Sequence, residues 1–161
     1  MSASAEKVVG PSEFAADRAA WMGALARADA ARLAARLDDL SEAPRWTVLR
    51  APEIGLVMVR GRAGGQGQPF NLGEMTVARA AVRLEDGAVG LGYVAGRDKA
   101  HAERAALVDA MMQSPQWRDL AQSRIVAPLV AERAQAAAET ARKVAATKVE
   151  FFTMVRARTQ P

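Results

Sequence analysis

Glycine is concentrated in one stretch of this 161-residue chain, and that concentration limits the possible folds more than any other feature. Ten of the 12 glycines lie between residues 45 and 96, where apolar residues are β-branched or alternate with polar ones. Alternation with a period of two predicts strands, and glycine is unfavourable inside helices. Apolar residues on both sides recur at helical spacing instead. We therefore expect an α+β fold, with a sheet in the middle and helices before and after it.

The composition is that of one soluble globular domain. Hydrophobic residues make up 50% of the chain and charged residues 25%. The chain has no cysteine, which excludes disulfides, thiolate metal sites and a cysteine nucleophile. The net charge of +4 is too small to indicate nucleic-acid binding by itself. Because the N-terminus carries no apolar stretch of signal-peptide length and residues 54–59 are too short to span a membrane, we expect a cytoplasmic protein.

The pattern predicts a four-stranded antiparallel sheet within about residues 45–96. The strands are expected at residues 46–49, 55–60, 74–84 and 89–94, and Glu85-Asp86-Gly87 carries the signal for a tight hairpin between the last two. In the third strand one face is predicted to hold Thr76, Ala78, Ala80, Val82 and Leu84.

Helices are expected on either side of this sheet. An N-terminal helix is predicted over residues 12–40, and Asp98 is placed to cap a helix that runs through Met112. A long C-terminal helix over residues 129–158 has a heptad-like apolar seam and is expected to dock on a partner. Residues 1–15 are expected to be a flexible segment, and residues 16–158 a single domain.

The densest polar cluster surrounds a glycine-rich loop between two predicted strands. Glycine lets a backbone adopt positive φ angles and present its amide protons, and two arginines stand at the strand end, so the loop can hold phosphate oxygens. The alternative is a surface hairpin that merely turns the chain. The spacing matches neither a Walker loop nor GxGxxG. The candidate substrate-binding residues are Arg60, Arg62, Gly64, Gly65, Gly67, Asn71 and Glu74.

A second polar cluster opens the helix that Asp98 caps. His101 is the only histidine of the chain, which makes a catalytic zinc site improbable but leaves general acid–base chemistry open. A structural role for His101 at the first turn of the helix is the alternative, and the one we favour. The residues expected at a partner interface or a shared site are Arg97, Asp98, His101, Glu103 and Arg104.

The C-terminal segment forms a third cluster that is apolar and basic. Aromatic residues and methionine are enriched at the cores of protein interfaces, which favours insertion into a partner. Docking onto the sheet of the same chain is an equally good interpretation. The residues concerned are Phe151, Phe152, Met154 and Arg156.

The stretches GLVMVRGRAGGQGQPF, RAAVRLEDG, GRDKAHAERAALVDAMMQ and VEFFTMVR resemble the PhnG subunit of the bacterial carbon–phosphorus lyase system. The likeness covers almost the full chain, and residues 1–15 lie outside it. It implies a cytoplasmic core complex with the subunits PhnH, PhnI and PhnJ, each present twice, and functional links to PhnL and PhnK. Nucleic acid and membrane are not implied as partners.

The resemblance also implies a reaction. ATP and an alkylphosphonate give α-D-ribose 1-methylphosphonate 5-triphosphate and adenine, with the nucleosidase-like chemistry on PhnI. ATP is a substrate of the complex, while the iron–sulfur cluster and S-adenosylmethionine belong to PhnJ, so no cofactor is expected on this chain. The resemblance supplies no catalytic residue. An accessory role in this reaction, a pure scaffold and, least favoured, a nucleic-acid-binding module remain open.

Overall fold

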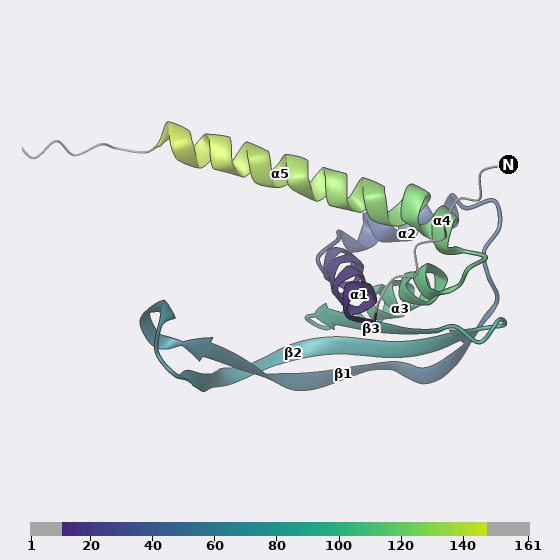
Figure 1. The fold of residues 1–161 in the computed structure, drawn as a ribbon, viewed down its shortest axis with the longest axis horizontal. Helices are drawn as coiled ribbons and strands as arrows, with labels where there is room; N and C mark the ends of the chain where they lie inside the picture. The colour runs from purple at the N-terminus through teal and green to yellow at the C-terminus, as the bar shows by residue number, and fades with distance from the viewer. Residues whose placement is uncertain (1–10, 148–161) are drawn as a thin grey trace, which may run out of the picture.

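The computed structural model describes residues 11–147 as one antiparallel sheet that carries helices on one face (Figure 1). The strands are β1 (Trp46–Arg62), β2 (Pro69–Leu84) and β3 (Val89–Ala95), in the order β1-β2-β3. The helices are α1 (Pro11–Ala26), α2 (Ala30–Asp38), α3 (Lys99–Gln113), α4 (Arg118–Ala121) and α5 (Ala127–Ala146), with a short turn η1 (Ala63–Gly65) and a π-helix η2 (Gln122–Val126). The predicted α+β class is confirmed.

The prediction of four strands is wrong, because the first two expected strands are one strand. β1 runs without interruption through Pro52 and pairs with β2 from Trp46 to Arg62, with irregular pairing only at residues 49–52 and at Arg60. Proline removes a backbone donor and is tolerated on an edge strand, which β1 is. Register shifts between Val48 and Arg50 and between Arg50 and Glu53 absorb the irregularity.

The alternation predicted for β2 is confirmed where helices cover it. Ala78, Ala80, Val82 and Leu84 are buried under the helical layer. The expected hairpin is also present, because Asp86 and Gly87 form the turn between β2 and β3, with Gly87 at φ 92°. The Asp86 carboxylate accepts a hydrogen bond from the amide of Ala88 at 3.0 Å and another from the buried hydroxyl of Ser114. The second bond ties this turn to the end of α3.

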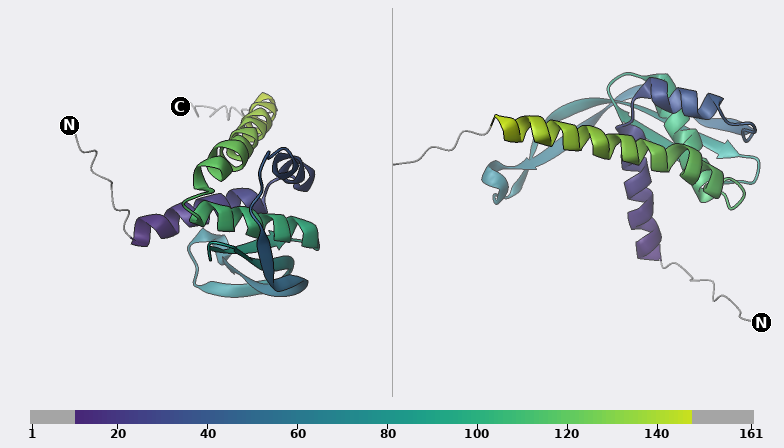
Figure 2. Two further views of the ribbon diagram at one scale, coloured as in Figure 1. Left: turned by 90° about the vertical axis from the view of Figure 1, so that its right-hand side faces the viewer. Right: turned by 90° about the horizontal axis from the view of Figure 1, so that it is seen from above.

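Helix α3 lies directly on β3 because glycine replaces side chains at the contact. A Cβ on Gly90 would sit 1.9 Å from the carbonyl oxygen of Ala106, and one on Gly92 would sit 1.8 Å from that of Ala102. Both alanines are fully buried. The backbone of α3 therefore lies directly against the backbone of β3. The core forms around this contact, between α3, α1 and the covered half of the sheet (Figure 2).

The prediction of one N-terminal helix over residues 12–40 is wrong, because the chain turns between α1 and α2. Asp29 adopts an extended conformation and its side chain accepts the amide of Arg32 at 3.0 Å, which starts a new helix. Leu33 of α2 is then fully buried. Because the chain turns between α1 and α2, both helices contribute side chains to the core. A single straight helix over the same residues would extend beyond it.

The C-terminal part of the described chain projects away from the core as α5 (Figure 1). Leu129 is buried at its beginning, whereas the seam residues Val130 and Val144 are 49% and 63% exposed. Docking of this helix on a partner therefore stays a prediction, and the part of the expected helix beyond residue 147 lies outside the described residues. Within residues 11–147, no helix is long and apolar enough to cross a membrane.

The close approach of α3 to β3 yields a stability prediction. Replacing Gly92→Ala forces a methyl group into a backbone carbonyl, and we expect the free energy of unfolding to fall by about 3 kcal/mol in urea denaturation. Gly55→Ala is the control, because its Cβ meets atoms no closer than 3.5 Å. Equal stability of the two variants would contradict the described packing.

The Ser114 contact yields a pH prediction. The hydroxyl of Ser114, followed by the amide of Ala88, lowers the pKa of Asp86. A lowered folded-state pKa stabilises the fold above the unfolded-state value of about 3.9, and this stability is lost as the pH falls through the folded-state pKa. The deficit of Ser114→Ala against the wild type, measured by urea denaturation, should therefore be larger at pH 7 than well below pH 4.

Ser123→Ala provides the control for this pH dependence. The Ser123 hydroxyl donates to the carbonyl of Asp119 at 2.7 Å, a group that does not titrate. Its effect on stability should be the same at both pH values. A Ser114→Ala deficit that did not change with pH would show that the Asp86 contact is absent in solution.

Candidate functional site

The glycine-rich loop forms the tip of a long hairpin made by β1 and β2. Arg60 pairs with Asn71 and Arg62 with Pro69, and η1 closes the turn. Gly64 and Gly65 adopt φ angles of 59° and 78°, which other residues rarely adopt, so glycine is required there. The structure thus brings all seven predicted substrate-binding residues to the outer part of one hairpin: Arg60, Arg62, Gly64, Gly65, Gly67, Asn71 and Glu74.

The tip is exposed and stands away from the helical layer (Figure 1). Among the described residues, neither Arg60 nor Arg62 makes a recorded ion pair. An anion held at the tip would therefore contact guanidinium groups and backbone amides on one side only. The tip resembles an arm that reaches toward another surface rather than a closed pocket.

The second predicted cluster is divided between two sides of α3. Asp98 caps the helix and accepts the amide of His101 at 2.8 Å, while Arg97 is exposed. The buried His101 ring places Nε2 2.9 Å from the carbonyl oxygen of Leu25, so Nε2 donates to the last turn of α1. His101 is therefore a structural contact between α3 and α1, and Glu103 and Arg104 point elsewhere.

Glu103 and Arg104 line a surface cavity of about 290 Å³ between α2, β1 and α3. Asp38 and Trp46 contribute to its wall as well. This cavity mixes both signs of charge with an aromatic surface. The structure does not connect it with His101 or with the hairpin tip, so the predicted clusters do not form one site.

A network around Asp109 is the densest buried polar cluster of the described chain, and the sequence interpretation missed it. Asp109 is fully buried in α3 and accepts hydrogen bonds from Trp21 Nε1 at 2.8 Å and from the amide of Leu91 at 2.9 Å. Arg18 forms an ion pair with it at 2.8 Å. The signal was one aspartate within the apolar run LVDAMM. Because both carboxylate oxygens are occupied, the group holds α1, β3 and α3 together.

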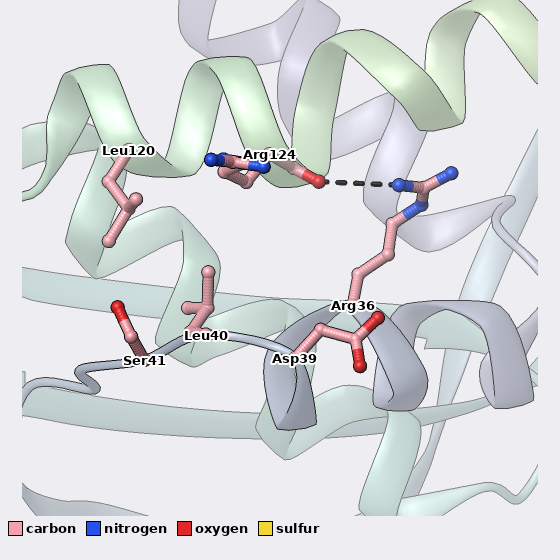
Figure 3. A pocket seen from close by; sticks show the side chains of 6 residues that line it. All are labelled: Arg36, Asp39, Leu40, Ser41, Leu120 and Arg124. Carbon is pink, nitrogen blue, oxygen red and sulfur yellow. Dashed lines mark hydrogen bonds between the residues drawn. The ribbon is translucent and has the colours of Figure 1, made fainter.

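Another cavity, of about 310 Å³, lies between the end of α2 and the π-helix η2 (Figure 3). Pro128 has no amide proton to donate to the carbonyl of Arg124 one turn earlier, and Arg36 Nη1 lies 3.4 Å from that oxygen instead. The second terminal nitrogen of Arg36, Nη2, forms an ion pair with Glu132. Glu132 also forms an ion pair with Arg32, at 2.8 Å. These arginines, Arg32 first, lower the pKa of Glu132. Arg36, in the wall of the cavity, thus braces α2 against η2 and α5.

Neither a metal cluster nor a catalytic set stands out in the described part of the chain. Residues 11–147 contain no group of three or more metal-ligating side chains. The third predicted cluster, Phe151, Phe152, Met154 and Arg156, lies outside the described residues. What the described residues offer chemically is the hairpin tip, an uncovered sheet and a projecting helix.

Comparison with known proteins identifies the family. A family model described as "Phosphonate metabolism protein PhnG" matches residues 16–157. The chain belongs to the PhnG family. A curated PhnG relative from Rhizobium meliloti (strain 1021) is 48% identical over 144 residues, which covers 88% of this chain and 90% of the relative. That relative is named alpha-D-ribose 1-methylphosphonate 5-triphosphate synthase subunit PhnG, so the resemblance described above is confirmed.

The Asp109 network leads to a prediction about this fold. Asp109→Asn removes the negative charge that pairs with Arg18. It also replaces an accepting carboxylate oxygen with an NH2 group that faces other hydrogen-bond donors. The free energy of unfolding should therefore fall by about 3 kcal/mol. Glu53→Gln is the control, because the Glu53–Arg79 pair at 2.8 Å is on the surface and should contribute less than about 1 kcal/mol. Urea denaturation measures both. An Asp109→Asn variant as stable as the control would show that the Asp109 network does not stabilise the fold.

Proposed function

We propose that this chain is an accessory subunit of a cytoplasmic carbon–phosphorus lyase core complex. In this role it supports transfer of an alkylphosphonate such as methylphosphonate to the ribose C1′ of ATP. Adenine leaves, and α-D-ribose 1-methylphosphonate 5-triphosphate is formed. The name of the Rhizobium relative supports the reaction, and the exposed hairpin tip supports a contribution to it.

The tip is the observation that carries this proposal. Arg60 and Arg62 are cations that match phosphate oxygens, and the turn between them and β2 presents backbone amides from residues with positive φ. A triphosphate and a phosphonate are the anionic parts of the two substrates. A hairpin that reaches over a neighbouring subunit can therefore contact them without having a pocket of its own.

The chemistry needs such help because water competes with the phosphonate. Displacement of adenine by water gives ribose 5-triphosphate, so the reacting atoms must be shielded from solvent. Closing a neighbour's site requires shape and charge but no nucleophile. The chain has no cysteine, so a thiolate-bound iron–sulfur cluster must be on another subunit.

The partners of the proposal are PhnI, PhnH and PhnJ, each present twice, with PhnL and PhnK in functional roles. In this arrangement PhnI carries the nucleosidase chemistry next to the hairpin tip. PhnJ carries the iron–sulfur cluster and uses S-adenosylmethionine for the later cleavage of the carbon–phosphorus bond.

A scaffold that touches no substrate is the second candidate. It is favoured by the apolar residues that the helices leave uncovered on the sheet, since exposed apolar surface of this kind marks a protein interface. The two candidates differ in one respect. A scaffold loses activity only when assembly fails, whereas an accessory subunit can lose activity within an intact complex.

The test replaces Arg62→Ala in the assembled complex. We expect formation of the phosphonate adduct to fall at least roughly tenfold, with more ribose 5-triphosphate formed, because a charge-assisted contact to phosphate is lost. Size-exclusion chromatography should show an unchanged complex. Arg142→Ala on the exposed part of α5 is the control and should leave the products unchanged. Loss of assembly with Arg62→Ala would favour the scaffold.

A further inference from the structure

The outer edge of β1 is protected along one part and open along another. β1 is an edge strand over all of its 17 residues, and proteins protect such edges with charges, proline and bulges. The part near the core has Arg50, Pro52 and Glu53 together with two register shifts. Residues 54–59 contain no charge or proline and pair regularly with β2. An edge of this kind is a ready template for another strand.

The side chains along the open part of the edge are apolar and uncovered. Ile54, Leu56 and Met58, which we name the hairpin strip, are 45%, 60% and 51% exposed. Ile54 pairs with Ala78, so the strip lies on the face of the sheet that carries the helices. The strip begins at Ile54, beside the part of the sheet that the helices cover. Leu56 and Met58 pair with Thr76 and Glu74, which lie beyond the residues 77–83 of β2 that pair with β3 (Figures 1 and 2). The strip therefore extends beyond the core.

The charges next to the strip indicate what kind of partner it fits. Arg60 and Arg62 follow directly along β1, and among the described residues neither makes a recorded ion pair. A strand laid along residues 54–59 brings its end close to these two arginines. An acidic residue at that end gains a charge-assisted contact.

We propose that an extended apolar segment of a neighbouring synthase subunit adds a strand to the sheet along residues 54–59 of β1. Its backbone pairs with the edge, its alternate side chains cover the hairpin strip, and an acidic residue meets Arg60, which follows the strip directly, while Arg62 nearer the turn stays available to a substrate anion. The inference rests on the proposed function, because it takes the chain to be a subunit of the complex. It adds the surface and the chemistry of the partner segment.

A second copy of the chain and the chain's own C-terminal segment fit this edge less well. Glu53 is the single acidic residue of β1, and Arg50 and Arg79 already hold it at 3.3 and 2.8 Å. The edge of a second copy therefore brings no free carboxylate. Residues 148–161 contain three basic residues, Lys148, Arg156 and Arg158, and one acidic residue, Glu150. Their net positive charge repels the arginines of the hairpin tip.

The test compares two lysine substitutions on β1. Leu56→Lys changes the hairpin strip, and Leu49→Lys changes the protected part of the same strand, where the side chains are 60% and 45% exposed. Tagged chain is titrated into a preparation of the other synthase subunits. We expect binding by Leu56→Lys to be at least roughly tenfold weaker and binding by Leu49→Lys to be unchanged. Thermal melting of each free variant checks that its fold is intact.

Hydrogen exchange on the wild type gives a readout that needs no variant. The amides of residues 54–59 that point away from β2 should exchange at least roughly tenfold more slowly in the complex than in the free chain. The proposal is overturned if these amides exchange equally in both, or if Leu56→Lys binds like the wild type. Protection in the free chain that rises with its concentration would assign the edge to a second copy. Protection that vanishes on deletion of residues 148–161 would assign it to the C-terminal segment. Either result would also overturn the proposal.

The two proposals fail in different ways. Absence of any association with the other subunits would refute the proposed function. Association with unchanged exchange at residues 54–59 would refute the strand addition alone. A loss of product with Arg62→Ala in an assembled complex bears on the first proposal and leaves the second as it is.

Discussion

The contact of α3 with β3 through Gly90 and Gly92 is the constraint on which the rest of the structure depends. Because a single methyl group would not fit there, the helix lies as close to the sheet as its backbone allows. The alanines of α3 then form the centre of the core, and Asp109 on the same helix holds α1 through Arg18 and Trp21. The core is therefore compact and covers only part of the sheet.

The uncovered part of the sheet follows from the lengths of the strands. β1 and β2 have 17 and 16 residues, whereas β3 has seven and lies beneath the helices. Within residues 11–147, the remaining hairpin has neither a third strand nor a helix over it, and two exposed arginines lie near its tip. Helix α5 leaves the core and projects in the same general direction (Figures 1 and 2). A chain with two such projections is suited to contacts with other subunits, in agreement with the name of its relative.

The sequence predicted the parts of the fold that local patterns determine. Alternation in β2, the Asp86-Gly87 turn and the Asp98 cap all depend on a few neighbouring residues, and all are present. The break between α1 and α2 was missed because Asp29 is a weak signal within an alanine-rich run. The union of the first two strands was missed because β1 accommodates Pro52 only as an edge strand, and strand order is not a local property.

The site was predictable to a smaller extent, because a site depends on which elements meet. The residues of the glycine-rich loop are neighbours along the chain and therefore stay together at the hairpin tip. His101 and Glu103 are also neighbours, but they point to different elements, and His101 bonds to Leu25 76 residues earlier. The Asp109 network joins residues from α1, β3 and α3, which no local pattern reveals.

The central claim is that this chain contributes surface and charge to a reaction centre on another subunit. It is tested most directly by product analysis of ATP and methylphosphonate with the purified chain alone, with the other subunits alone, and with both together. The account predicts no turnover by the chain alone, and a change from ribose 5-triphosphate to the phosphonate adduct when the chain joins the others. Turnover of ATP by the isolated chain at an enzyme-like rate would contradict it.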